Sequence, residues 1–240
     1  MSDGMEDKIR NLEEWNKERE RLKPVVDAAV DYHNQARFEA RRRNYGKALI
    51  LYKEAIKHYK KALGLNPKYY LKDLINRIDH VIEEHVNNTF NLKISSDNLK
   101  TAKGINEFVE FIDNLKGEEK KYIDQYNIAQ AFLRIGDLYY EEEGRRKEAY
   151  DFYSRVIDVN CDRPFVNRDA YFKMGLILLS EDRFKEALVT FVSVLSFDRD
   201  NSDIIGYIDH CLRKLGIVEH KAKFLVATPM EARKLIMEVL

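Results

Sequence analysis

Residues 132–153 read FLRIGDLYYEEEGRRKEAYDFY, and residues 171–191 read YFKMGLILLSEDRFKEALVTF. Both stretches begin with an aromatic residue, continue with a large apolar residue next to a glycine, and end with an alanine followed four positions later by an aromatic residue. Residues four apart lie on one face of an α-helix, and a small residue on that face lets a second helix come close. The two stretches therefore predict two similar pairs of packed helices. The matching positions are Phe132, Ile135, Gly136, Tyr139, Ala149 and Tyr153 in the first stretch and Tyr171, Met174, Gly175, Leu178, Ala187 and Phe191 in the second.

A related pattern occurs in residues 44–67, NYGKALILYKEAIKHYKKALGLNP. A tyrosine recurs every seven residues in this stretch, and each tyrosine is followed three residues later by an alanine. Seven residues are two helical turns, so the tyrosines form one row and the alanines a neighbouring row on the same side. This arrangement predicts a long helix packed against an antiparallel partner, for which the preceding segment is the candidate. The positions are Tyr45, Tyr52 and Tyr59, and Ala48, Ala55 and Ala62.

These patterns resemble the tetratricopeptide repeat, over about 130–200 and, with more departures, over 28–67. Gly136 and Gly175 are 39 residues apart, whereas that family repeats about every 34 residues. Residues 25–86 also resemble the three-helix microtubule-interacting and trafficking domain, with NYGKALILYKEAIKHYKKAL as its second helix and LKDLINRIDHVIEEHV as its third. Both resemblances stay open for the N-terminal part.

The resemblance implies an all-α fold of antiparallel helix-hairpin repeats that form an α-solenoid or superhelix. Only 4 prolines and 10 glycines occur in 240 residues, which favours long helices with few breaks. The expected parts are an N-terminal amphipathic helix at 1–24, a helical unit with a capping helix at 25–86, a linker and degenerate repeat at 87–125, two repeats with a capping helix at 126–216, and C-terminal helices at 217–240.

Several boundaries follow from local signals. Pro24 predicts a break after the first helix. Residues 87–98, NNTFNLKISSDN, are rich in Asn and Ser and predict a linker, with a short strand at 90–94 as the one candidate strand. The similar segments DLINRIDH (73–80) and DIIGYIDH (203–210) predict capping helices, either of two sub-arrays or within one continuous array.

The C-terminal segment ATPMEARKLIMEVL carries the signature of a helix start. Thr228 is a candidate N-cap, Pro229 stands at the first helical position, and Glu231 follows Thr228 by three residues. A short helix with one apolar stripe is marginal in water unless it docks. We expect this helix to pack onto the helix that carries Ile204, with occupation of the repeat groove as the alternative.

Net charge, cysteine number and the length of apolar runs indicate the compartment in which the protein functions. Lys and Arg number 41 and Asp and Glu 41, so no net charge draws the chain toward nucleic acid or a membrane. Two cysteines, Cys161 and Cys211, argue against a disulfide framework, and no apolar run is long enough to span a bilayer. These features predict a cytoplasmic protein.

No pattern of catalytic residues, and no motif for a cofactor or a metal, is legible in the sequence. His80, Glu84 and His85 look at first like metal ligands, but the second histidine follows the first by five residues and so leaves the shared helix face. A phosphate-binding glycine loop, a nucleophile elbow and a paired-cysteine motif are also missing from the sequence. The sequence therefore predicts a protein that is not an enzyme.

In tetratricopeptide arrays the first helix of each pair lines a concave groove that holds a peptide or a helix of a partner protein. Carried over by position, this implies a partner-binding groove, joined in the first unit by His33, Arg37 and Arg41. The set used by chaperone-tail binders is missing, because Leu133 and Phe172 stand where basic residues are needed. The resemblance thus favours an apolar or aromatic-bearing ligand, while simple packing against neighbouring helices is the structural alternative. The groove residues are Gln130, Leu133, Asp137, Tyr140, Asp169, Phe172, Leu176 and Leu179.

Residues 37–61 carry nine basic residues against two Glu. This basic face is either a solvated surface or a contact for an acidic protein or RNA. The sequence predicts a non-catalytic protein-interaction scaffold or adaptor, with RNA binding through the basic face as the alternative, and it leaves the oligomeric state open. The basic residues are Arg37, Arg41, Arg42, Arg43 and Lys47, followed by Lys53, Lys57, Lys60 and Lys61.

Overall fold

The chain forms consecutive antiparallel helix hairpins, as seen in a computed structural model that describes residues 3–115 and 117–240. Over these residues every regular element is helical, which confirms the predicted all-α fold. The helices group into two compact units, residues 1–123 and 124–240, and each is described by itself.

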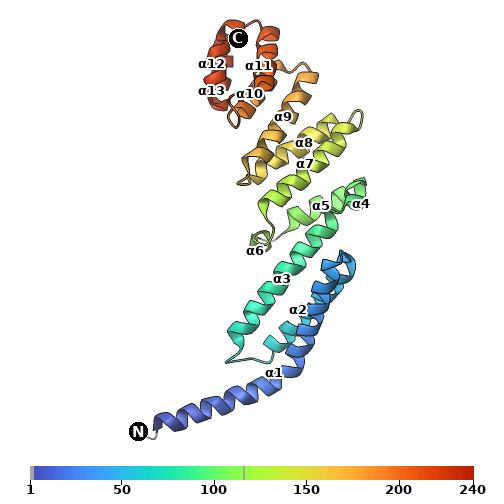
Figure 1. The fold of residues 1–240 in the computed structure, drawn as a ribbon, viewed down its shortest axis with the longest axis vertical. Coiled ribbons are helices and arrows are strands. Elements are labelled where there is room, and N and C mark those ends of the chain that lie inside the picture. Colours follow the sequence, from blue (N-terminus) through green and yellow to red (C-terminus); the bar gives the residue numbers. More distant parts are fainter. Residues whose placement is uncertain (1–2, 116) are drawn as a thin grey trace. The chain divides into compact units, whose positions relative to one another are not determined.

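The first unit is built on three long helices, α1 (Asp3–Arg41), α2 (Tyr45–Leu63) and α3 (Leu71–Lys93), which lie side by side in Figure 1. Shorter helices follow, α4 (Ser96–Leu99), α5 (Ala102–Asn114) and α6 (Gly117–Lys120). Helix α2 packs against both α1 and α3, so it is the central helix of the three.

Small residues in seven-residue steps form the contact between α1 and α2. On α1 the buried side chains are Leu22, Ala29 and Ala36, and on α2 they are Ala48, Ala55 and Ala62, all in one core cluster. Because both rows advance by two helical turns, the two helices stay close along the whole hairpin. The alanine row thus has the close-packing role that its spacing predicts, and Tyr52 and Tyr59 are buried beside it.

Helix α1 does not end at Pro24, so the predicted break and the separate helix at 1–24 are wrong. A proline inside a helix removes one backbone hydrogen bond, and α1 changes direction along its length in Figure 1. The buried carboxylate of Glu18 accepts backbone hydrogen bonds from Lys68, Tyr69 and Tyr70 at 2.8–3.0 Å, just before α3 begins. Burial alone would raise the pKa of Glu18, but these hydrogen bonds lower it below its usual value.

Helix α3 runs through most of the segment predicted as a linker, and the candidate strand at 90–94 is wrong because this segment is helical to Lys93. Val86 and Phe90 continue the buried face of α3, and the Phe90 ring packs edge-on against Phe108 of α5 at 5.9 Å. The Asn and Thr side chains that suggested a loop are bonded to backbone instead. Asn88 Nδ2 donates to the carbonyl of Tyr45, and Thr89 Oγ1 donates to the carbonyl of His85, both at 2.9 Å.

The second unit begins with two hairpins, α7 (Gln125–Glu141) with α8 (Arg146–Val159) and α9 (Pro164–Ser180) with α10 (Phe184–Leu195). The glycines of the repeated pattern lie at the helix crossings. A Cβ atom at Gly136 would come within 2.4 Å of the Tyr153 ring, and one at Gly175 within 2.7 Å of the Phe191 ring. The glycines are therefore required by the close approach of the two helices in each hairpin.

The chain ends with α11 (Ser202–Leu215), the short turn η1 (Val218–His220), α12 (Lys221–Val226) and α13 (Pro229–Val239). Helix α13 packs chiefly along α10, which corrects the expected docking onto α11. Its buried residues Ala232 and Ile236 belong to the same core cluster as Ile204 of α11, so α13 covers that core from the α10 side.

The predicted capping box at the start of α13 is confirmed. The Glu231 backbone N–H donates to Thr228 Oγ1 at 3.3 Å, and the Thr228 N–H donates to the Glu231 carboxylate at 2.7 Å. We expect Thr228→Ala to lower the free energy of unfolding by about 1 kcal/mol. Urea denaturation followed by circular dichroism measures this effect, and Thr228→Ser is the matched control that keeps the hydroxyl. Equal losses in both variants would contradict the role assigned to the cap.

Candidate functional site

Two cavities lie between α1 and α3 in the first unit, one toward each end of α3. The residues that line them recur at helical steps, from Lys23 to Arg41 on α1 and from Arg77 to Glu84 and Asn91 on α3. Such spacing puts them on one face of each helix, and we call the face that carries both cavities the α1–α3 groove.

The larger cavity lies where α1 ends and has a volume of about 650 Å³. It is polar, and Tyr45 and Tyr52 of α2 form its inner wall. We call it the amide cavity because three asparagines of α3 line it. The polar residues around it are Arg37 and Arg41 from α1 and His80, Glu83, Glu84, Asn87, Asn88 and Asn91 from α3.

A network of charged side chains joins α1 to α3 at this cavity. His33 Nε2 donates to Glu84 Oε2 at 2.7 Å, and Arg37 Nε donates to both Glu84 oxygens at 2.8 and 2.9 Å. The second nitrogen of the guanidinium, Arg37 Nη2, lies 2.5 Å from His80 Nε2. Burial alone would raise the pKa of Glu84, but the bonds from His33 and Arg37 lower it to about 2. Glu84 is therefore a fixed anion that ties the two walls of the groove together.

Tyrosines of α2 and charged residues of α3 both recur every seven residues, so they meet in pairs across the two helices. Tyr52 interacts with Glu84, and Tyr59, one heptad later, interacts with Arg77, one heptad earlier on the antiparallel helix. Burial, with the nearby Glu84 carboxylate, raises the pKa of Tyr52 to about 12. Seven-residue spacing thus brings two phenol groups beside charged residues of α3 while their rings fill the core.

Two polar groups of the amide cavity have no partner within the part of the chain that the structure describes. Asn88 is 3% exposed, and its Oδ1 atom is buried without a hydrogen bond although its Nδ2 is bonded. Arg41 is exposed and lies within ion-pair distance of no described carboxylate. A buried acceptor left unbonded costs free energy, so a donor supplied by a ligand would be favoured there.

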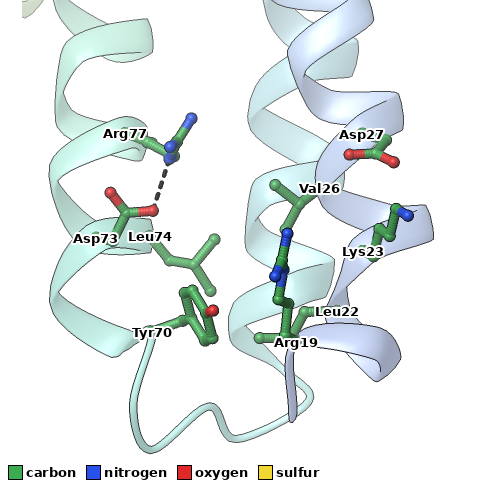
Figure 2. Close-up of a pocket in the computed structure, with 9 residues that line it drawn as sticks. All are labelled: Arg19, Leu22, Lys23, Val26, Asp27, Tyr70, Asp73, Leu74 and Arg77. Atoms are coloured by element: carbon green, nitrogen blue, oxygen red, sulfur yellow. Dashed lines mark hydrogen bonds and ion pairs between the residues drawn. The ribbon is translucent and has the colours of Figure 1, made fainter. Parts of the chain in front are cut away.

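The smaller cavity, with a volume of about 200 Å³, lies toward the start of α3 and is drawn in Figure 2. Tyr70, just before α3, and Leu74 of α3 face Leu22 and Val26 of α1, with Arg19 between them, and Arg77 is bonded to Asp73 at 2.7 Å. This end of the groove therefore has an apolar base and a charged rim.

The predicted groove residues of the second unit meet different surroundings. Asp137 Oδ1 accepts hydrogen bonds from Tyr153 at 2.8 Å and from Lys173 at 2.5 Å, so it ties α7 to α8 and α9. Phe172 packs against Phe191 and Tyr207. Leu176 and Leu179 are half-buried against the same core cluster.

The remaining four predicted residues are more accessible. Gln130 is exposed and donates to the Tyr126 hydroxyl at 2.5 Å. Tyr140 is 39% exposed, Leu133 is half-buried, and Asp169 pairs with its neighbour Arg168 at 2.8 Å. The structure therefore divides the predicted set, because Phe172, Leu176 and Leu179 pack against neighbouring helices and Gln130 and Tyr140 stay open to a ligand.

His80, Glu84 and His85 do not meet at one point. His80 and Glu84 line the amide cavity, whereas His85 lines a separate cavity between α3 and α5. Burial lowers the pKa of His85. Over the described residues, no three His, Cys, Asp or Glu side chains are arranged to hold a metal ion.

The basic residues of 37–61 do not form one face. Arg37 points into the groove and pairs with Glu84, and Lys47 pairs with Glu39 at 2.6 Å. Exposed lysines follow the outer side of α2 instead, at Lys53, Lys57, Lys60 and Lys61. The run that looks continuous in sequence is split between the groove and the opposite surface.

The asparagines of α3 are the site residues that the sequence analysis missed. They were assigned to a linker because their composition resembles a loop. The signal that would have found them is the apolar spacing of Val81, Val86 and Phe90, which continues the helix through this segment.

Comparison with known proteins finds tetratricopeptide repeats in both units. Residues 47–69 match one family model of the tetratricopeptide repeat, and residues 130–159 match another. The first match supports the tetratricopeptide alternative for the N-terminal unit, and such repeats generally mediate protein–protein interactions. No curated protein matches the chain.

Among solved structures, the crystal structure of MamA protein is similar at 15% sequence identity, covering 89% of this chain and 96% of that chain. The TM-score is 0.35, a value too low to support any conclusion about this chain. Over the described residues, no helix is both long and apolar enough to cross a membrane.

Proposed function

We propose that this chain is a non-catalytic scaffold or adaptor that holds an extended, acidic segment of a partner protein in the α1–α3 groove. The observation that carries the proposal is the amide cavity of about 650 Å³, which is lined by the buried Asn88 and by Arg41, a guanidinium with no ion-pair partner among the described residues. The two free cysteines are both buried, in keeping with a cytoplasmic setting.

The groove suits an extended segment in length and in polarity. The lined part of α1, from Arg19 to Arg41, extends for roughly 30 Å, which an extended chain covers with about ten residues. Asparagine amides donate and accept, so Asn87, Asn88 and Asn91 can pair with main-chain N–H and C=O groups.

Charge favours an acidic ligand at this end of the groove. Glu84 is neutralised by its bonds to His33 and Arg37, which leaves Glu83 as the one further carboxylate lining the described cavity. Arg41 lines the same cavity, and Arg42 and Arg43 follow it at the helix end. A carboxylate side chain of the partner would form a charge-assisted hydrogen bond with Arg41.

The second unit is proposed to contribute a separate contact for an apolar or aromatic-bearing segment. Tyr126 of α7 packs edge-on against Phe165 of α9 at 5.7 Å, and Phe165 is exposed together with Tyr140. Exposed aromatic rings on neighbouring helices are typical of protein-interaction surfaces. Gln130, Leu133, Asp137 and Asp169 remain proposed members of this surface.

RNA binding is the second candidate function, favoured by the exposed lysines on the outer side of α2. RNA binding predicts a different dependence of affinity on salt concentration. RNA affinity falls steeply as salt rises, because binding releases counterions, and it would depend on Lys53 and Lys60 rather than on Arg41.

A peptide selection on the full chain tests the proposed function. Random peptides displayed on phage are selected against the immobilised protein, and enrichment of Asp or Glu in the bound pool is expected. Arg41→Gln should weaken binding of a selected peptide about tenfold or more, because a charge-assisted hydrogen bond is lost. Lys60→Gln is the matched control, with the same loss of charge on the outer surface, and should bind as the parent does. Selected peptides that bind both variants equally would contradict the groove assignment.

A further inference from the structure

The position of Arg37 selects the tautomer of neutral His80. A guanidinium has only donors, so His80 Nε2, 2.5 Å from Arg37 Nη2, must present its lone pair. The ring proton of neutral His80 then lies on Nδ1, which is 3.5 Å from a Glu83 oxygen, an acceptor. The geometry requires the neutral Nδ1–H form of His80 whenever Arg37 stays in this place.

Protonation of His80 would break that arrangement. A second ring proton, on Nε2, would face an N–H of Arg37. Two donor nitrogens 2.5 Å apart cannot form a hydrogen bond with each other, so this contact would be lost. The nearest acceptor for the new proton is Glu84 Oε1, 3.3 Å from Nε2 and already bonded to Arg37. The imidazolium would therefore compete with Arg37 for Glu84, and Arg37 Nη2 would lose one acceptor or both.

We infer that His80 is a proton-controlled switch on the amide cavity, which accepts one N–H of Arg37 Nη2 when neutral and frees that N–H for a bound acidic group when protonated, while Glu84 keeps Arg37 at α3. This inference rests on the proposed function, because the acidic group belongs to the partner segment. Arg37 and Glu84 both line the cavity, so the freed N–H faces the ligand space.

The charged and titratable groups around His80 are compatible with the loss of the Arg37 contact when His80 is protonated. From α1 it faces Arg37 and the ring of His33, at 5.9 Å, and Arg41 lines the same cavity. From α3 it faces Glu83 and Glu84, and from α2 Tyr52 reaches the same network. Glu84 stays ionised across the range in which imidazoles titrate, because its pKa is about 2.

Linkage gives the sign of the effect. If acid frees a donor that an acidic ligand then bonds, the ligand also favours proton uptake, and its affinity rises as the pH falls. An aspartate in the ligand remains ionised above about pH 5.5, since its pKa is about 3.9. We expect an acidic peptide to bind roughly three- to tenfold more tightly at about pH 5.5 than at about pH 7.5.

The binding experiment uses an aspartate-containing peptide from the selection, with fluorescence anisotropy at both pH values. His80→Gln keeps an acceptor for Arg37 but cannot be protonated, so its affinity should not change with pH. His58→Gln is the matched control, because His58 stacks on Tyr32 at 5.3 Å, outside the network, and this variant should keep the full pH response. A pH response that persists in His80→Gln, or disappears in His33→Gln alone, would overturn the inference.

A second measurement needs no ligand. Long-range proton–nitrogen correlation spectra of the free protein report which ring nitrogen of His80 carries the proton. The expected result is an Nδ1–H tautomer at about pH 7.5, and an Arg37→Gln variant should shift the population toward Nε2–H, since the donor that selects the tautomer is gone. An Nε2–H tautomer in the parent protein overturns the switch even if peptides bind. A failed peptide selection with the expected tautomer refutes the proposed function and the release step, and leaves only the neutral Arg37–His80 contact.

Discussion

Replacing Gly136 with alanine is expected to lower the free energy of unfolding by about 1–3 kcal/mol, although alanine is the better helix former. The new methyl group would lie 2.4 Å from the Tyr153 ring. Tyr153 cannot move aside easily, because its ring is fully buried and its hydroxyl is bonded to Asp137. The helices of the hairpin must therefore separate or the ring must leave its rotamer. Urea denaturation followed by circular dichroism measures the loss.

Gly206→Ala is the matched control for this experiment. Gly206 lies inside α11, and a Cβ atom there would meet no heavy atom within 4 Å. The same substitution at this place should be neutral or should stabilise the protein by about 0.5–1 kcal/mol, because a helical glycine costs backbone entropy. If Gly136→Ala and Gly206→Ala have equal effects, the close helix crossing at Gly136 is wrong.

Replacing Glu84 with alanine is expected to cost about 2–3 kcal/mol in the first unit. The change leaves the buried His33 Nε2–H and the Arg37 guanidinium without their shared acceptor. Trp15, the one tryptophan of the chain, stacks on Tyr70 at 5.6 Å, so its fluorescence reports on the α1–α3 packing during urea denaturation. Glu83→Ala is the matched control, because that neighbouring side chain is about half exposed and should change stability by less than about 0.5 kcal/mol.

The pH dependence of the parent protein provides a further check on Glu84. Its pKa is about 2 in the folded chain and 4.5 by default, so the carboxylate contributes stability above about pH 4.5 and loses it as the pH falls toward 2. Glu84→Gln should be less stable than the parent at neutral pH, and the difference should shrink in acid. A constant difference between the two proteins from pH 7 to pH 3 would contradict the assigned ion pairs.

Local spacing in the sequence determines the hairpins. Gly136 before Tyr153, Gly175 before Phe191 and the alanine heptads of α2 each lie within one hairpin, where the sequence separation is short and the helical period fixes which residues share a face. The start of α13 was equally predictable, since its capping box involves residues three apart.

The candidate site depends on contacts that no local pattern encodes. Glu84 meets His33 and Arg37 across 51 and 47 residues, and Asn88 bonds to Tyr45 across 43. The same long-range contacts explain the errors. Glu18 of the continuous α1 accepts a hydrogen bond from a residue just before α3, and Phe90 of α3 packs against α5 where the composition indicated a loop. Periodicity assigns side chains to a helix face, but only the packing of one helix on another decides which residues that face meets. Whether a helix continues or ends also depends on groups from elsewhere in the chain, which can outweigh the local preference.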